Sequence, residues 1–182
     1  MGIFGRRLIV CALVATASFA ALGCGYSLAG RGSFLPSYVQ TIGVPTFVNR
    51  TRVYDVEMQL TQKVRAEFIG RGKYKIVPED KDVDAVLIGE VVSVDSVPAA
   101  FDDQRIATRY TLIMTARVQL RSLSENKVLW ENPNLVFRDD YDVQTGVGTL
   151  DPATFFGQDA NALERMTSAF ARNIVTAILE AF

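Results

Sequence analysis

Two kinds of side chain in this sequence have the type and spacing to do chemistry: a cysteine thiol and a row of arginines. Cys24 follows small residues at the end of an apolar run, and four arginines recur in the alternating segment 105–121. The 182-residue chain has one further cysteine, Cys11, and no histidine. It therefore lacks the commonest general base, the commonest metal ligand and the usual partner of serine or cysteine nucleophiles. We expect no catalytic activity, no metal and no cofactor.

The first 23 residues have the pattern of a secretory signal. Arg6 and Arg7 give a basic start, and an apolar run follows from Leu8 to Ala21. This run of 14 residues is shorter than the roughly 20 that a membrane-spanning helix needs. A basic start, a short apolar run and small residues near a cleavage point are typical of exported proteins. We predict that residues 1–23 are removed.

The cleavage point resembles a lipobox. In proteins with this motif, the cysteine of a segment such as Ala21-Leu22-Gly23-Cys24 becomes the first residue of the mature chain and carries acyl chains on its thiol and amine. Ala21 departs from the more usual leucine. Several acyl chains would anchor the protein far more firmly than a single chain can. The alternative is an ordinary signal peptide that has a cysteine nearby.

Composition indicates one globular domain without a nucleic-acid partner. Removing Arg6 and Arg7 lowers the count of basic residues from 19 to 17, against 20 acidic residues. A nucleic-acid-binding domain would instead show a strong basic excess. We predict a lipidated N-terminus and tether over 24–40 and a single domain over 41–182, which is long enough to bury one core.

Apolar periodicity predicts two amphipathic helices. The first is expected to begin at Thr51 as the N-cap and to stop at the glycines of 70–72, and the second to begin at a capping box of Asn161 and Glu164. Steps of three and four residues place the apolar side chains of each helix on one face. The two predicted stripes are Val53, Val56, Leu60, Val64 and Phe68, and Leu163, Met166, Phe170, Ile174, Ala177, Ile178 and Ala181.

Five segments read as strands: 41–47, 74–77, 83–97, 105–122 and 128–141, the last with a break at Pro133. The clearest alternates with period two, and Pro98–Gln104 is expected to be the hairpin loop before it. The strand, helix and strand over 41–77 predict a crossover between parallel strands. We predict an α+β two-layer sandwich, with both helices on one face of a mixed, mostly antiparallel four- to five-stranded sheet.

The order of these pieces resembles the LptE family of lipopolysaccharide-assembly lipoproteins. The resemblance covers essentially the whole chain, although each motif is short. The motifs are Cys24-Gly-Tyr-Ser-Leu28, Ile42-Gly-Val-Pro-Thr-Phe-Val-Asn-Arg-Thr51, Asp84-Ala-Val-Leu-Ile-Gly89, Arg109-Tyr-Thr-Leu112 and Lys127-Val-Leu-Trp-Glu131.

The resemblance implies a non-catalytic protein at the periplasmic face of the outer membrane. Members of this family are plug and assembly partners of the large β-barrel LptD, and they help to deliver lipopolysaccharide to the cell surface. Gly25, where retained lipoproteins carry aspartate, also favours the outer membrane. As an alternative, the segments 44–51 and 72–77 resemble periplasmic activators of penicillin-binding proteins and curli-secretion lipoproteins.

Two groups of residues are candidates for contact with these partners. Guanidinium groups suit bidentate contact with the phosphates of lipopolysaccharide; the alternative is that they are solubilising charges neutralised by nearby carboxylates. An aromatic pair could pack against the partner barrel, or against the core of its own domain. The candidates are Arg105, Arg109, Arg117 and Arg121 for lipopolysaccharide, and Phe155 and Phe156 for the barrel.

Overall fold

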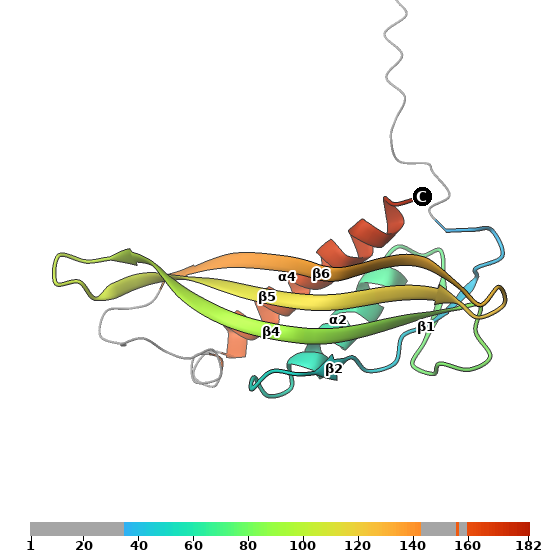
Figure 1. Cartoon of the computed structure of the whole chain (residues 1–182), viewed down its shortest axis with the longest axis horizontal. Helices are drawn as coiled ribbons and strands as arrows, with labels where there is room; N and C mark the ends of the chain where they lie inside the picture. Colours follow the sequence, from blue (N-terminus) through green and yellow to red (C-terminus); the bar gives the residue numbers. More distant parts are fainter. Residues whose placement is uncertain (1–34, 143–155, 157–159) are drawn as a thin grey trace, which may run out of the picture. The chain divides into compact units, whose positions relative to one another are not determined.

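The structure is a computed structural model of the whole chain, and it describes residues 35–142, Phe156 and residues 160–182. The described strands are β1 (Thr41–Gly43), β2 (Val48–Asn49), β3 (Lys75–Val77), β4 (Ala85–Phe101), β5 (Ala107–Ser122) and β6 (Lys127–Asp142). The described helices are α2 (Val56–Gly70) and α4 (Ala160–Leu179). Figure 1 shows these two helices on the same side of the long strands.

The strands form one mixed sheet. Its order is β3-β1-β4-β5-β6, with the short β2 paired to β4. The three long strands β4, β5 and β6 are antiparallel, whereas β1 lies parallel to both β3 and β4. The predicted fold class is confirmed, including the parallel pair around α2, and the sheet has six strands instead of four or five. The extra strand, β2, is only two residues long and leaves no sequence signal of its own.

The core lies between the helices and one face of the sheet. Every apolar residue of the first predicted stripe is buried, and so are Leu163, Met166, Phe170, Ile174 and Ile178 of the second. From β5, the same layer receives Leu112, Met114, Ala116, Val118 and Leu120. The alternation that predicted a half-buried strand is thus confirmed over Tyr110–Leu120. Ala177 is only partly buried, and Ala181 is exposed because α4 ends before it, at Leu179.

The starts of both helices differ from the prediction. Asp55 occupies the N-cap position of α2 with a left-handed backbone (φ 59°), and its side chain makes no capping hydrogen bond. The Thr51 hydroxyl instead accepts a hydrogen bond from the Val53 N–H at 3.1 Å, inside the preceding turn. Thr51 is therefore not the cap. Asn161 already lies within α4, so the predicted capping box was also placed wrongly.

The two prolines of the long strands do not end them. Pro98 lies inside β4, which continues to Phe101, so the hairpin loop is shorter than predicted. The ladder shifts its register beside Pro98 and again opposite Pro133. Pro133 lies in β6, the edge strand, where a residue without an N–H is tolerated. The predicted break at Pro133 is therefore a register shift within one continuous strand.

The segment between β1 and α2 is held by hydrogen bonds to α2 and by packing against β4. The Phe47 N–H donates to Thr61 Oγ1 at 2.9 Å, and the Arg65 guanidinium donates to the Val44 carbonyl at 2.7 and 2.9 Å. The Phe47 ring lies against Gly89 of β4, where an added Cβ would approach it to 2.4 Å. Glycine is needed there because any side chain would occupy the position of the ring. Two motifs of the sequence are thus joined by a packing contact.

None of the helices among the described residues combines the length and apolar character needed to cross a bilayer.

Candidate binding surfaces

The sheet has one face that the two helices leave open. Its residues lie on alternate positions of β4, β5 and β6, and neighbouring strands bring opposite charges and hydroxyl groups together. We call this the open face; it includes Ile88, Glu90, Thr111, Ile113, Thr115, Arg117, Gln119, Glu131 and Asp140.

The open face holds one carboxylate between two guanidinium groups. Glu90 accepts a hydrogen bond from Arg50 at 2.7 Å and another from Arg117 at 2.9 Å. The pKa of the Glu90 carboxyl lies below its ordinary value, chiefly because of the hydrogen bond from Arg50 and despite partial desolvation, with the charge of Arg117 adding to the effect. Arg50 belongs to the segment before α2, which sequence reasoning had read only as a family motif.

The four predicted arginines are not brought together. Arg109 forms an ion pair with Asp142 at 2.7 Å, and Arg117 forms one with Glu90. Arg121 donates to the Asn126 side chain in the β5–β6 turn. Arg105 lies in the β4–β5 hairpin with a left-handed backbone (φ 62°), so it is not a strand residue. Arg109 and Arg117 are therefore paired with carboxylates, as the alternative interpretation expected, but both pairs remain accessible to solvent.

Of the predicted aromatic pair, the structure describes Phe156 alone. Phe156 is only 5% exposed and belongs to the core cluster, which favours a segment that packs on its own domain over contact with a barrel. Phe155, like Cys24, lies outside the described residues, and the predictions for both stay predictions.

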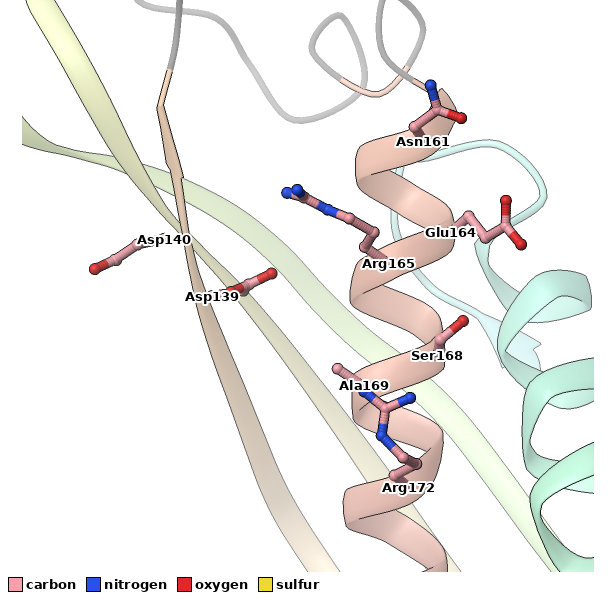
Figure 2. Close-up of a pocket in the computed structure, with 8 residues that line it drawn as sticks. All are labelled: Asp139, Asp140, Asn161, Glu164, Arg165, Ser168, Ala169 and Arg172. Atoms are coloured by element: carbon pink, nitrogen blue, oxygen red, sulfur yellow. The ribbon is translucent and has the colours of Figure 1, made fainter. Parts of the chain in front are cut away.

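A second polar surface lies in a groove between the edge strand β6 and α4. Figure 2 shows Asp139 directed from β6 toward the helix, while Asp140 points away from it. Arg165 and Arg172 are seven positions apart on α4 and line the same hollow of about 580 Å³. The guanidinium carbon of Arg165 lies 4.9 Å from the centre of the Tyr141 ring. Sequence reasoning missed this basic pair because it treated α4 only as a source of core residues.

Within the described residues, no group of three or more histidine, cysteine or carboxylate side chains is arranged to hold a metal ion.

The fold and surfaces define a class of protein, a two-layer α+β domain whose helices cover one sheet face and whose other face is open. The family model of LptE, described as lipopolysaccharide-assembly, matches residues 39–178, and the chain belongs to this family. It is thus a lipopolysaccharide-assembly lipoprotein of the cell envelope. The match spans the sandwich from the end of the tether to the last turn of α4.

Solved structures resemble the fold at low sequence identity. Protein XCC0632 from Xanthomonas campestris is 14% identical with a TM-score of 0.50, over 79% of this chain and 85% of that one. The rare lipoprotein B from Shewanella oneidensis is 18% identical with a TM-score of 0.49, over 76% and 93% of the two chains. A minor lipoprotein from Acinetobacter baumannii is 14% identical with a TM-score of 0.45, over 79% and 94%. A search of curated protein sequences finds no significant match.

Proposed function

We propose that this protein is an outer-membrane lipoprotein that partners an LptD-like β-barrel, as its plug and assembly factor, in delivering lipopolysaccharide to the cell surface. In this proposal residues 1–23 are removed, residues 24–40 form the lipidated N-terminus and tether with the acyl chains on Cys24, and residues 41–182 form the domain. It acts by binding and not by catalysis. The observation that carries the proposal is the family match over residues 39–178.

The open face is the surface that we assign to the barrel. Its strands β4, β5 and β6 are 16 or 17 residues long, and α2 and α4 pack on the other face. Apolar side chains lie among its charges, with Ile88 and Val97 about half exposed. A surface that mixes apolar side chains with laterally paired charges is suited to a partner that supplies both apolar and polar contacts.

Lipopolysaccharide is proposed to contact the arginines of the same face. The guanidinium groups of Arg109 and Arg117 are about half exposed, and ion pairs open to water are weak because water and salt screen them. A phosphate can therefore compete for each guanidinium with a charge-assisted bidentate contact. Arg105 and Arg121 lie at opposite ends of β5, roughly 50 Å apart at the rise of an extended strand, so one headgroup cannot engage all four arginines.

Co-purification tests the proposal most simply. We expect a tagged, lipidated protein from detergent-solubilised outer membranes to carry a large β-barrel protein in near-equal amount, identified by mass spectrometry. Recovery of a penicillin-binding protein or a secretion ring in place of a barrel would instead support the alternative role in wall synthesis or secretion.

Lipopolysaccharide binding is tested with two matched double variants. Arg109→Glu with Arg117→Glu alters the open face, and Arg165→Glu with Arg172→Glu makes the same change of charge in the groove beside α4. We expect only the first pair to lose binding of purified lipopolysaccharide. Loss in the groove variant alone would move the site to α4, and unchanged binding in both would end the assignment to these arginines.

A further inference from the structure

The turn between β2 and α2 carries the most exposed large apolar side chain among the described residues. Tyr54 is 83% exposed, whereas Val53 before it and Val56 shortly after it are buried. The two valines fix the backbone on both sides of Tyr54, so the core determines where this tyrosine stands although its ring lies in water. We call residues 50–55 the tyrosine turn.

Asn49 holds the tyrosine turn by four side-chain hydrogen bonds. Its Nδ2 donates to the Val53 carbonyl and to Glu57 Oε2, both at 2.8 Å. Its Oδ1 accepts from the N–H and the hydroxyl of Thr51, also at 2.8 Å. The turn is thus ordered before any partner binds, and a side chain on an ordered turn loses less conformational entropy on binding.

The last residue of the turn has a strained backbone. Asp55 is left-handed (φ 59°), and its side chain makes no capping hydrogen bond with α2. Such a conformation costs free energy in a residue other than glycine, and conformations of this kind gather at functional sites. Burial of the neighbouring Tyr54 does not offset this cost in the free protein, because that residue is exposed. Contact with a partner would.

The tyrosine turn borders the open face along β4. Val48 and Asn49 pair with Glu90 and Val91, and the Arg50 N–H donates to the Val91 carbonyl at 2.9 Å. The Arg50 side chain then bonds Glu90, which belongs to the open face. Figure 1 shows β2 on the β4 side of the sheet, away from β6. A partner that covers the open face and continues past β4 therefore meets the turn.

The side chains of the turn indicate the chemistry of that partner. Tyrosine and arginine are enriched among the residues that dominate protein–protein binding, where an aromatic ring fills an apolar pocket. Arg52 is exposed and forms no ion pair with the residues that the structure describes, so it is available to a carboxylate. Arginine could also meet anionic headgroups, but a single tyrosine offers too little apolar area to hold a domain on a membrane. A protein pocket edged by carboxylates fits this pair best.

We propose that Tyr54 is an anchor side chain of the interface with the β-barrel, that Arg52 pairs with a carboxylate at the edge of the same pocket, and that Asn49 is a positioning residue for both. This inference rests on the proposed function. It extends the barrel contact from the open face around the edge of β4, as expected of a plug that the wall of its barrel surrounds.

Competition in the cell tests the inference. A variant and the wild-type chain carry different tags and compete for a limiting amount of barrel, and mass spectrometry measures the barrel protein that each tag carries. We expect Tyr54→Ala to carry at least about tenfold less barrel than the wild type, as for the loss of a central aromatic anchor. Tyr38→Ala, the same truncation outside the turn, should carry an equal share, and thermal unfolding of Tyr54→Ala should be unchanged because the residue is exposed.

This design separates the two possible failures. A wild-type chain that carries no barrel would remove the proposed function and this inference together. A wild-type chain that carries barrel while Tyr54→Ala takes an equal share would remove this inference alone. Arg52→Glu should also lose its share, whereas Arg172→Glu, the same change on α4, should not; equal shares for these two variants would overturn the carboxylate-edged pocket.

The role of Asn49 is tested by combining variants. Asn49→Ala removes the hydrogen bonds that order the turn, so we expect it to lower the share of barrel while Tyr54 is present. In a chain that already carries Tyr54→Ala, the same substitution should cause no further loss. Losses that add would show that Asn49 supports only the fold, and would contradict its positioning role.

Photocrosslinking identifies what the turn touches. Tyr54 is replaced by p-benzoylphenylalanine, which keeps an aromatic ring at this position, and adducts are collected from intact cells. We expect an adduct with the barrel protein. An adduct with lipid alone would assign the turn to the membrane, and an adduct with a protein other than a barrel would assign it to another partner; either result would overturn the proposal.

Discussion

The two faces of the β4–β5–β6 sheet differ in what holds their side chains. Leu87 and Ile88 are neighbours in β4, yet Leu87 is fully buried beneath the helices and Ile88 is 47% exposed on the open face. The apolar side chains of the buried face pack against α2 and α4 of the same chain, and this packing stabilises the fold. The open face is organised by lateral pairs such as Arg117 with Glu90 and Thr111 with Asp140, all reachable by water. One face therefore determines the fold, and the other is the face that we propose meets a partner.

The largest expected difference in stability is between truncating a side chain on the buried face and truncating one on the open face. Leu87→Ala is expected to lower the free energy of unfolding by about 2–5 kcal/mol, because it leaves a cavity in the core. Ile88→Ala should change it by no more than about 0.5 kcal/mol, because that site is half exposed. Denaturant unfolding of both variants measures the difference. Similar losses from the two variants would contradict the distinction between the faces.

A methyl group at Gly89 tests the contact that joins two family motifs. Gly89→Ala is expected to destabilise the fold by about 1–3 kcal/mol, because the new Cβ would meet the Phe47 ring. Gly70→Ala is the matched control, since nothing lies within 4 Å of its added Cβ, and it should be neutral or gain up to about 1 kcal/mol. Combining Gly89→Ala with Phe47→Leu should recover part of the loss. No recovery would mean that the ring is not the obstacle.

A smaller loss of stability is expected when the carboxylate of Asp84, the residue before β4, is removed. Asp84 Oδ2 accepts hydrogen bonds from the Gln40 and Thr41 N–H groups at 2.9 and 2.8 Å, which fastens β1 to β4. Asp84→Ala should cost about 1–2 kcal/mol, since hydrogen bonds to a charged acceptor are lost and one donor is partly buried. Asp80→Ala, in the exposed loop before β4, should have no such effect in the same thermal unfolding measurement.

The smallest expected change in stability comes from Glu90 on the open face, and it depends on pH. The pKa of Glu90 is lowered in the folded protein, so its ionised form stabilises the fold above the ordinary glutamate value, and this contribution is lost as the pH falls through the lowered pKa. Glu90→Gln should therefore reduce the melting temperature slightly at neutral pH, and the difference should shrink as the pH falls through the lowered pKa of Glu90. A difference that persists in acid would show that Glu90 acts through packing and not through charge.

The same two faces explain how far the sequence predicted the molecule. Burial of one face makes apolar residues recur with the period of the helix or strand. The apolar stripes of both helices and the alternation of β5 could therefore be predicted from the sequence. Contacts between segments that are distant in the sequence give no such pattern. The contact of Arg50 with Glu90 and the groove residues Arg165 and Arg172 were therefore not predicted. Thr51 has the chemistry of a cap, but the chain makes one more turn before α2 begins at Val56.

Photocrosslinking in the living cell tests most directly whether the open face meets a barrel. A photoreactive amino acid is introduced at Thr115 or Gln119 on the open face, and at Gln62 or Asn173 on the helix layer as controls. We expect adducts with a large outer-membrane β-barrel protein from the first two positions and few or none from the other two. Barrel adducts from the helix layer alone, or adducts with a different class of protein from the open face, would contradict the account.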